Sequence, residues 1–236
     1  MLRKPVAPTS QQGRLASASN RVAPRATVLL TGFSPFGGET INSSWEAVQV
    51  LQGEQIGGHT VVCAQLPVTF DVSHEQLMDL VREHHPALVI CVGQATGRRA
   101  ISLERIAINI ADARLADNAG AQPIDKPVVS GGQPAYFTSL PIKAMLRDLT
   151  EAGLSAEVSQ TAGTFVCNHL FYGLMHDLQR RRGLIGVRGG FIHLPGLAPA
   201  DAQPMRLQDM QQGLRIAIAS ALATTQDVKL GAGATS

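Results

Sequence analysis

Short apolar runs alternate along the chain with longer segments in which apolar residues recur every three or four positions. Glycine, proline or polar turns bound the runs, as they bound strands that are buried on both faces. Ile106, Ile108 and Ile110 alternate with smaller or polar residues, which predicts one strand with a single buried face. The continuous runs predict strands at residues 27–31, 59–66, 87–92, 156–160 and 190–194.

The longer segments predict helices because their apolar residues fall on one face at helical spacing. Ser43 and Ser73 each precede a Glu or Gln by three residues, which is the spacing of a capping box. Ser139 is a third candidate cap, with Pro141 in the first turn and Gly153 after the last. These signals predict helices at residues 43–51, 73–85, 139–153, 166–178 and 207–222.

This order of elements predicts one domain, a three-layer α/β/α sandwich. The 236 residues alone allow one or two domains, but no internal linker is apparent. We expect a flexible basic tail at residues 1–26, a folded domain at 27–225 and a flexible tail at 226–236.

Composition and charge exclude several classes of protein. Hydrophobic residues make up 44% of the chain, enough for a substantial core. The net charge is +2, but five basic residues and no acid lie in the first 26 positions, which leaves 15 basic and 18 acidic residues elsewhere. A nucleic-acid partner is therefore not expected, and no apolar run is long enough to span a membrane.

The cysteines indicate a reducing compartment. Cys63, Cys91 and Cys167 are an odd set without metal-type spacing, and no apolar signal segment begins the chain. We therefore expect a cytoplasmic protein with no metal. Cys63 and Cys91 lie within apolar strand runs and are expected to be small core residues.

Cys167 is the candidate nucleophile. It falls in the first turn of the helix predicted from Val166, after a strand-to-helix crossing. A helix N-terminus favours a thiolate and offers backbone N–H groups to an oxyanion. The alternative is a cysteine that only packs at the start of a helix.

Two further residues complete a candidate constellation with Cys167. His193 ends the strand 190–194, and functional groups of open α/β sheets gather where strands end. Glu104, in the segment expected to form a loop after the strand 87–92, is the best-placed carboxylate to orient the imidazole. The alternatives are a core histidine and a surface ion pair of Glu104 with Arg98 or Arg105.

The glycine-rich segment Gly32–Gly38 joins a strand to a helix but lacks the spacings of phosphate-binding loops. Phe33 and Phe36 within it suit the wall of an apolar ligand site. A loop that packs its own aromatic rings is the alternative.

Several blocks of sequence resemble one family of enzymes. They are GFSPFGG (Gly32–Gly38), ERIAIN (Glu104–Asn109), SQTAGTFVCNHLFY (Ser159–Tyr172) and GFIHLP (Gly190–Pro195). In the same order, these blocks resemble the pyroglutamyl peptidases of type I, or pyrrolidone-carboxylate peptidases, over residues 28 to 222. The resemblance implies a cysteine exopeptidase that removes an N-terminal pyroglutamyl residue through a thioester, without a cofactor.

The resemblance also implies roles for individual residues. Cys167 would be the nucleophile, His193 the general base and acid, and Glu104 the third member. Arg114 would help the Cys167 N–H to form the oxyanion hole. The implied fold has a mixed, mostly parallel sheet, and the implied assembly is a homotetramer. The implied pyroglutamate pocket consists of Phe33, Phe36, Gln94, Phe165 and Val166.

Two other functions remain as alternatives. A phosphate-using enzyme that cleaves nucleosides on a similar sandwich would need anion contacts from the glycine loop and no role for Cys167. A binding module without activity would be favoured by loss of a triad residue, and Cys167, His193 and Glu104 are all present.

Overall fold

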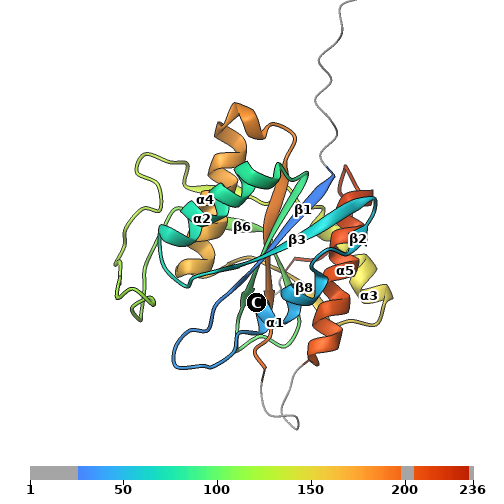
Figure 1. Ribbon diagram of the computed structural model, residues 1–236, viewed down its shortest axis with the longest axis horizontal. Coiled ribbons are helices and arrows are strands. Elements are labelled where there is room, and N and C mark those ends of the chain that lie inside the picture. The colour runs from blue at the N-terminus through green and yellow to red at the C-terminus, as the bar shows by residue number, and fades with distance from the viewer. Residues whose placement is uncertain (1–25, 198–204, 234–236) are drawn as a thin grey trace, which may run out of the picture.

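A seven-stranded sheet forms the centre of the molecule (Figure 1). The computed structural model describes residues 26–197 and 205–233, so the predicted tail 1–26 lies outside it except for its last residue. The strand order is β2-β3-β1-β4-β9-β5-β8. The strands are β1 (Thr27–Phe33), β2 (Gln55–Ile56), β3 (His59–Leu66), β4 (Leu88–Gln94), β5 (Ile101–Glu104), β8 (Ala156–Ser159) and β9 (Arg188–Leu194).

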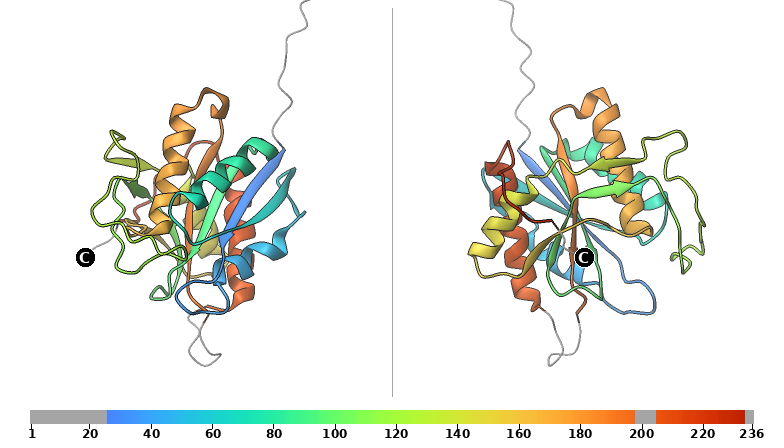
Figure 2. Two further views of the ribbon diagram at one scale, coloured as in Figure 1. Left: turned by 60° about the vertical axis from the view of Figure 1, so that its left-hand side comes forward. Right: turned by 180° about the vertical axis from the view of Figure 1, so that it is seen from behind.

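Helices cover both faces of this sheet, as a three-layer sandwich requires. One face carries α1 (Ser43–Val48), α3 (Ile142–Glu151) and α5 (Leu207–Ala223), and the other carries α2 (Val72–His84) and α4 (Val166–Arg180). Figure 2 shows the yellow α3 beside the red α5, with the orange α4 across the sheet from them. Short 3-10 turns follow α1 at Gln49–Leu51 and α4 at Arg182–Leu184. Across the described residues, no helix has both the length and the apolar character needed to cross a bilayer.

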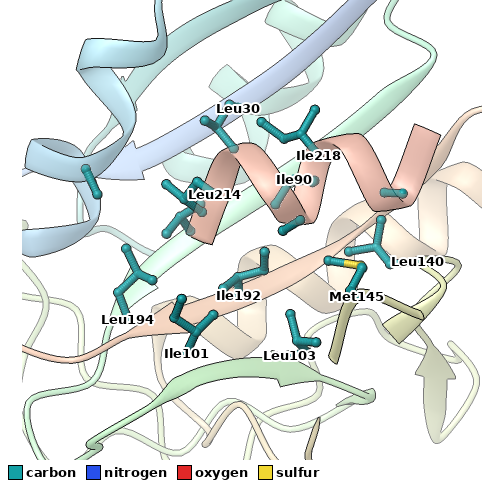
Figure 3. Packing of buried hydrophobic residues seen from close by; sticks show 14 of the residues in the cluster. Leu30, Ile90, Ile101, Leu103, Leu140, Met145, Ile192, Leu194, Leu214 and Ile218 are labelled. Atoms are coloured by element: carbon teal, nitrogen blue, oxygen red, sulfur yellow. The ribbon is translucent and has the colours of Figure 1, made fainter. Parts of the chain in front are cut away.

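The continuous apolar runs are explained by burial on both faces. Leu30 on β1 faces one hydrophobic cluster while its neighbour Leu29 faces the other, because successive side chains of a strand point to opposite sides. Figure 3 shows Leu30, Ile90 and Ile192 of the sheet around Leu214 and Ile218 of α5. All are fully buried.

The structure confirms the predicted fold class and most of the predicted elements, with one addition that matters for the site. Residues 101–104, which we expected to lie in a loop, form β5 and pair antiparallel with β9. The predicted strand through Ile106, Ile108 and Ile110 is the shorter β6 (Ile106–Ile108), which pairs with β7 (Ala135–Phe137) in a separate two-stranded sheet. Its fully buried residue is Ala107, whereas Ile110 is exposed, so the expectation that the isoleucines form the buried face was wrong. The central sheet is therefore mixed, with β2 and β5 as sources of antiparallel pairs.

The three predicted serine caps were wrong, whereas Gly153 follows the last turn of α3 as predicted, with a left-handed φ of 78°. Asn42, not Ser43, caps α1, because its side chain accepts a hydrogen bond from the Ser44 N–H at 3.0 Å. Ser73 lies within α2, and the residue at the N-cap position of that helix is Asp71. Ser139 precedes α3 without capping it.

The cap of α3 comes from the far end of the sequence. The Asp227 carboxylate accepts hydrogen bonds from the N–H groups of Lys143 at 3.0 Å and Ala144 at 2.9 Å. The Lys143 ammonium donates to the Leu230 carbonyl. The described part of the segment expected to be a flexible tail therefore contacts α3.

Replacing Asp227 by alanine should destabilise the fold without affecting activity. The change removes both acceptors from the first turn of α3, and loss of such a cap costs about 1 kcal/mol. We expect a lower Tm than for Lys229→Ala, which alters an exposed residue two positions away. Equal Tm values for the two variants would contradict a capping role.

Candidate active site

A cavity of about 250 Å³ opens where the parallel strands β1, β4 and β9 end. Phe33, Gln94 and His193 come from the ends of these strands, and Cys167 comes from the start of α4. The cavity is lined by Phe33, Phe36, Asn42, Val68, Gln94, Ala162, Phe165, Val166, Cys167 and His193. It thus brings together Cys167, His193 and all five residues expected to form the pocket.

Glu104 lies behind His193 on the neighbouring strand. Because β5 runs antiparallel to β9, with Ser102 opposite His193, the end of β5 reaches the imidazole. Nδ1 of His193 lies 2.7 Å from Oε1 of Glu104. The carboxylate is fully buried and His193 is 4% exposed. This pair is the orienting contact that sequence reasoning expected, although Glu104 lies on a strand and not in a loop.

Arg98 adds a second partner to the same carboxylate. Its Nη1 donates to Oε1 of Glu104 at 2.6 Å, and its Nη2 donates to the Thr161 carbonyl at 2.8 Å. The sequence offered an Arg98–Glu104 ion pair only as an alternative to an orienting role. Both contacts are present, and the ion pair is not on the surface.

Cys167 is the second residue of α4. The sequence favoured a thiolate at this position, but burial, and after it the charge of Glu104, raise the pKa of Cys167 to about 12. The positive charge of Arg98 acts in the opposite direction. At neutral pH the resting side chain is therefore a thiol.

Burial also lowers the pKa of His193 below its ordinary value of 6.5, against the opposing effect of Glu104. The imidazole is therefore neutral at neutral pH, and its contact with Glu104 makes Nδ1 the protonated nitrogen. Nε2 is left as the basic atom. A neutral thiol and a neutral base can act together if the proton moves as the sulfur attacks.

Aromatic rings form one wall of the cavity. The ring centroids of Phe36 and Phe165 are 5.1 Å apart, and Phe70 packs edge-on against Phe165 at 5.2 Å. The glycine loop therefore both packs its aromatic side chains and lines the cavity with them. Phe70, which the sequence analysis missed, supports this wall from behind.

Gln94 and Asn42 are held by local hydrogen bonds. Oε1 of Gln94 accepts from the Ser43 N–H at 2.6 Å, and its Nε2 donates to Glu39 at 2.5 Å. Asn42 donates to the Ser34 carbonyl at 3.0 Å while it caps α1. The capping pattern around Ser43 was the only sequence signal near Asn42, and it pointed to the wrong residue.

Arg114 is exposed and lies in a neighbouring cavity of about 290 Å³. That cavity is lined by Asp112, Arg114, Leu115 and Thr164, and it shares Phe36 and Phe165 with the first. The structure therefore does not bring Arg114 into the wall of the Cys167 cavity.

Asp117 anchors the loop that carries Arg114. Its buried carboxylate accepts hydrogen bonds from the N–H groups of Phe70, Ala119 and Ala121 at 2.8 to 2.9 Å. Asn118 donates to the Pro35 carbonyl at 3.0 Å, which ties the same loop to the glycine segment. Asp-Asn in a polar stretch is a turn signal, but the long-range partners are not readable from sequence.

Metal ligands do not cluster in the part of the chain that the structure describes. Among residues 26–197 and 205–233, no three His, Cys, Asp or Glu side chains are grouped as a metal site would need.

An α/β sandwich that holds a thiol at a helix start, in one cavity with a carboxylate-oriented histidine, has the layout of a thiol-dependent hydrolase. The family model described as pyroglutamyl peptidase matches residues 26–224. The chain belongs to the pyroglutamyl peptidase family.

Individual relatives agree with this assignment. The chain is 56% identical to the pyrrolidone-carboxylate peptidase of Cupriavidus necator over 86% of its own length and 96% of that protein. It is 53% identical to the enzyme of the same name from Klebsiella pneumoniae, over 89% of this chain and 99% of that one. The crystal structure of pyroglutamyl peptidase I from Bacillus amyloliquefaciens has a TM-score of 0.84 and 44% identity, covering 88% of this chain and all of that one.

Replacing Gly93 by alanine should impair the site. A Cβ on Gly93 would lie 3.0 Å from the Cys167 sulfur and 2.9 Å from Cζ of Phe191. The sulfur or the ring must then shift, and misplacement by about 1 Å can cost about 100-fold in rate. We expect kcat to fall by this order.

Gly97→Ala is the matched control, because no atom of the described residues lies within 4 Å of a Cβ at that position. Its kcat should equal that of the unaltered protein. Unchanged kcat in Gly93→Ala would show that the sulfur does not need its present position.

Proposed function

We propose that this pyroglutamyl peptidase hydrolyses the bond after an N-terminal pyroglutamyl residue through a thioester on Cys167. The observation that carries the proposal is the buried His193–Glu104 contact of 2.7 Å beside a cavity that Cys167 also lines. Family membership supplies the substrate class.

Each proton has a donor and an acceptor in this mechanism. The Cys167 sulfur attacks the pyroglutamyl carbonyl carbon while its proton passes to Nε2 of His193. The tetrahedral intermediate collapses as His193 returns that proton to the leaving amine, and the C–N bond breaks. Water then gives a proton to His193 and attacks the thioester, which releases pyroglutamate and restores the thiol.

Glu104 acts while His193 is charged. During each half of the reaction the imidazole becomes imidazolium, and a buried carboxylate at 2.7 Å stabilises that charge. Outside the reaction, burial returns His193 to its neutral form. The base is therefore regenerated after each step.

The oxyanion is proposed to bind at the N-terminus of α4. The first helical hydrogen bond at this end is from the His169 N–H to the Phe165 carbonyl at 3.0 Å, so the Cys167 N–H precedes it. Arg114 from the adjoining cavity is the second proposed donor. This role requires its long side chain to turn toward the Cys167 cavity when substrate binds.

The pyroglutamate ring is proposed to lie among Phe33, Phe36, Phe165 and Val166, with Gln94 at its polar edge. Because both ends of the Gln94 carboxamide already have partners, its contact with substrate replaces the bond to Glu39. Glu39 lies on the loop that carries Phe36, so binding of the ring and adjustment of this loop are linked.

Assembly and compartment are further parts of the proposal. The family resemblance implies a homo-oligomer, and a tetramer is the state that we propose. Light scattering on the purified protein measures this. A cytoplasmic location is proposed because a thiol nucleophile must remain reduced.

Cys167→Ala and His193→Ala should each lose several orders of magnitude in kcat on pyroglutamyl amides, because they remove the nucleophile and its base. Glu104→Gln should fold and bind substrate but turn over slowly, since a neutral acceptor orients His193 without stabilising its charge. Wild-type rates in Cys167→Ala would overturn the mechanism. Omitting phosphate from the assay should not affect the unaltered protein.

Specificity provides an independent test. Pyroglutamate is a neutral lactam, whereas an N-terminal proline keeps the ring but lacks the lactam carbonyl and carries a charged amine. Burying that charge without a partner is costly, and such polar mismatch can discriminate by about 10⁴-fold. We expect kcat/KM on pyroglutamyl amides to exceed that on prolyl amides by this order. Comparable values would contradict the pocket while leaving the cysteine mechanism intact.

A further inference from the structure

The Glu104 carboxylate is bonded in an unusual way. Both His193 and Arg98 contact the same oxygen, Oε1, at 2.7 and 2.6 Å. The other oxygen, Oε2, is buried and has no hydrogen-bond partner among residues 26–197 and 205–233. Arg98 therefore binds the same oxygen that orients His193, and not the other oxygen of the carboxylate.

Arg98 is also the permanent charge next to Glu104. A fully buried carboxylate is costly unless a charge or hydrogen bonds compensate it. Within the described residues, the ion-pair partners of Glu104 are His193 and Arg98, and His193 is neutral at rest. The Arg98 side chain is 22% exposed, so it remains partly hydrated while one of its nitrogens reaches a buried atom.

The second contact of Arg98 extends to the segment that precedes the nucleophile. Its Nη2 donates to the Thr161 carbonyl, which also accepts from Ser159 Oγ at 3.0 Å. From Thr161 the chain passes through Ala162 and Phe165, two walls of the cavity, to Cys167. One side chain thus bridges the loop after β4, the end of β5 and the approach to α4.

We propose that Arg98 is a positioning residue for the reaction, which pairs with the buried Glu104 and fixes it relative to the segment that carries Cys167. This inference deepens the proposed function and rests on it. A lysine could supply the charge but not both contacts, because only the guanidinium has a planar fork of donors.

The charges around the site give the direction of the expected effects. Glu104 on β5 raises the pKa of both Cys167 and His193, and Arg98 lowers both. The buried Cys91 thiol on β4 also raises the pKa of Cys167. Removing the positive charge of Arg98 should therefore raise the pKa of His193 and make the Cys167 proton harder to remove.

The experiment compares Arg98→Met, Arg98→Lys and the control Arg99→Met, an exposed arginine one position away. For Arg98→Met we expect kcat to fall by about 10- to 100-fold, the range for loss of a charged hydrogen bond, with little change in KM. The acidic limb of the kcat/KM profile should move to higher pH, and iodoacetamide should modify Cys167 more slowly. Arg98→Lys should return the acidic limb of the kcat/KM profile to its wild-type pH but restore only part of kcat.

Distinct outcomes would overturn the inference. Unchanged kcat and an unmoved acidic limb in Arg98→Met would exclude any role. A fall in kcat with a lower Tm, an unmoved limb and no rescue in Arg98→Lys would show a structural role only. If Arg98→Met does not fold, Arg98→Lys is the deciding variant. A wild-type kcat in Arg98→Lys would show that the reaction does not need Arg98 to contact both Glu104 and the Thr161 carbonyl. Failure of the proposed function would appear separately, as activity retained in Cys167→Ala.

Discussion

The cost of burying the Glu104 carboxylate is the constraint on which the rest of the site depends. A charge with no exposure must be compensated from within the protein. The antiparallel pairing of β5 with β9 delivers one partner, His193, and the turn between β4 and β5 delivers the other, Arg98. The site therefore requires that β5 run antiparallel to β9, although most neighbouring strands are parallel. If β5 ran parallel to β9, Glu104 at its end would not lie beside His193.

Burial also sets the resting state of the reacting groups. It raises the pKa of Cys167 and lowers that of His193, so both side chains are neutral before substrate binds. The layout differs from a stable thiolate–imidazolium pair, in which the nucleophile is charged in advance. Here charge develops during attack, when Glu104 can stabilise the imidazolium and the N-terminus of α4 can stabilise the oxyanion. Groups that are fixed beforehand need no reorganisation at that moment.

The sequence predicted the layers, most elements, and the positions of Cys167 and His193, because apolar periodicity and strand ends are local signals. Glu104 was the right residue in the wrong element, since the short segment Ile101–Glu104 becomes a strand only through its pairing with β8 and β9. The capping of α3 by Asp227 and the contact of Asp117 with Phe70 were not predictable, because each joins residues that are more than 40 positions apart. Arg98 was considered as a competitor to His193 for Glu104, whereas one oxygen accepts both.

The same constraint explains why the site suits a neutral ligand. The cavity walls are largely aromatic and aliphatic, the Cys167–His193 pair is neutral at rest, and Arg98 compensates Glu104. A lactam ring enters such a space without introducing a charge, whereas a free N-terminal ammonium would face no unpaired carboxylate there. An ammonium would also oppose formation of the imidazolium nearby, and so weaken the step that begins the reaction. Selectivity for a cyclised terminus and the use of a neutral thiol–imidazole pair are therefore two results of one buried, electrically balanced site.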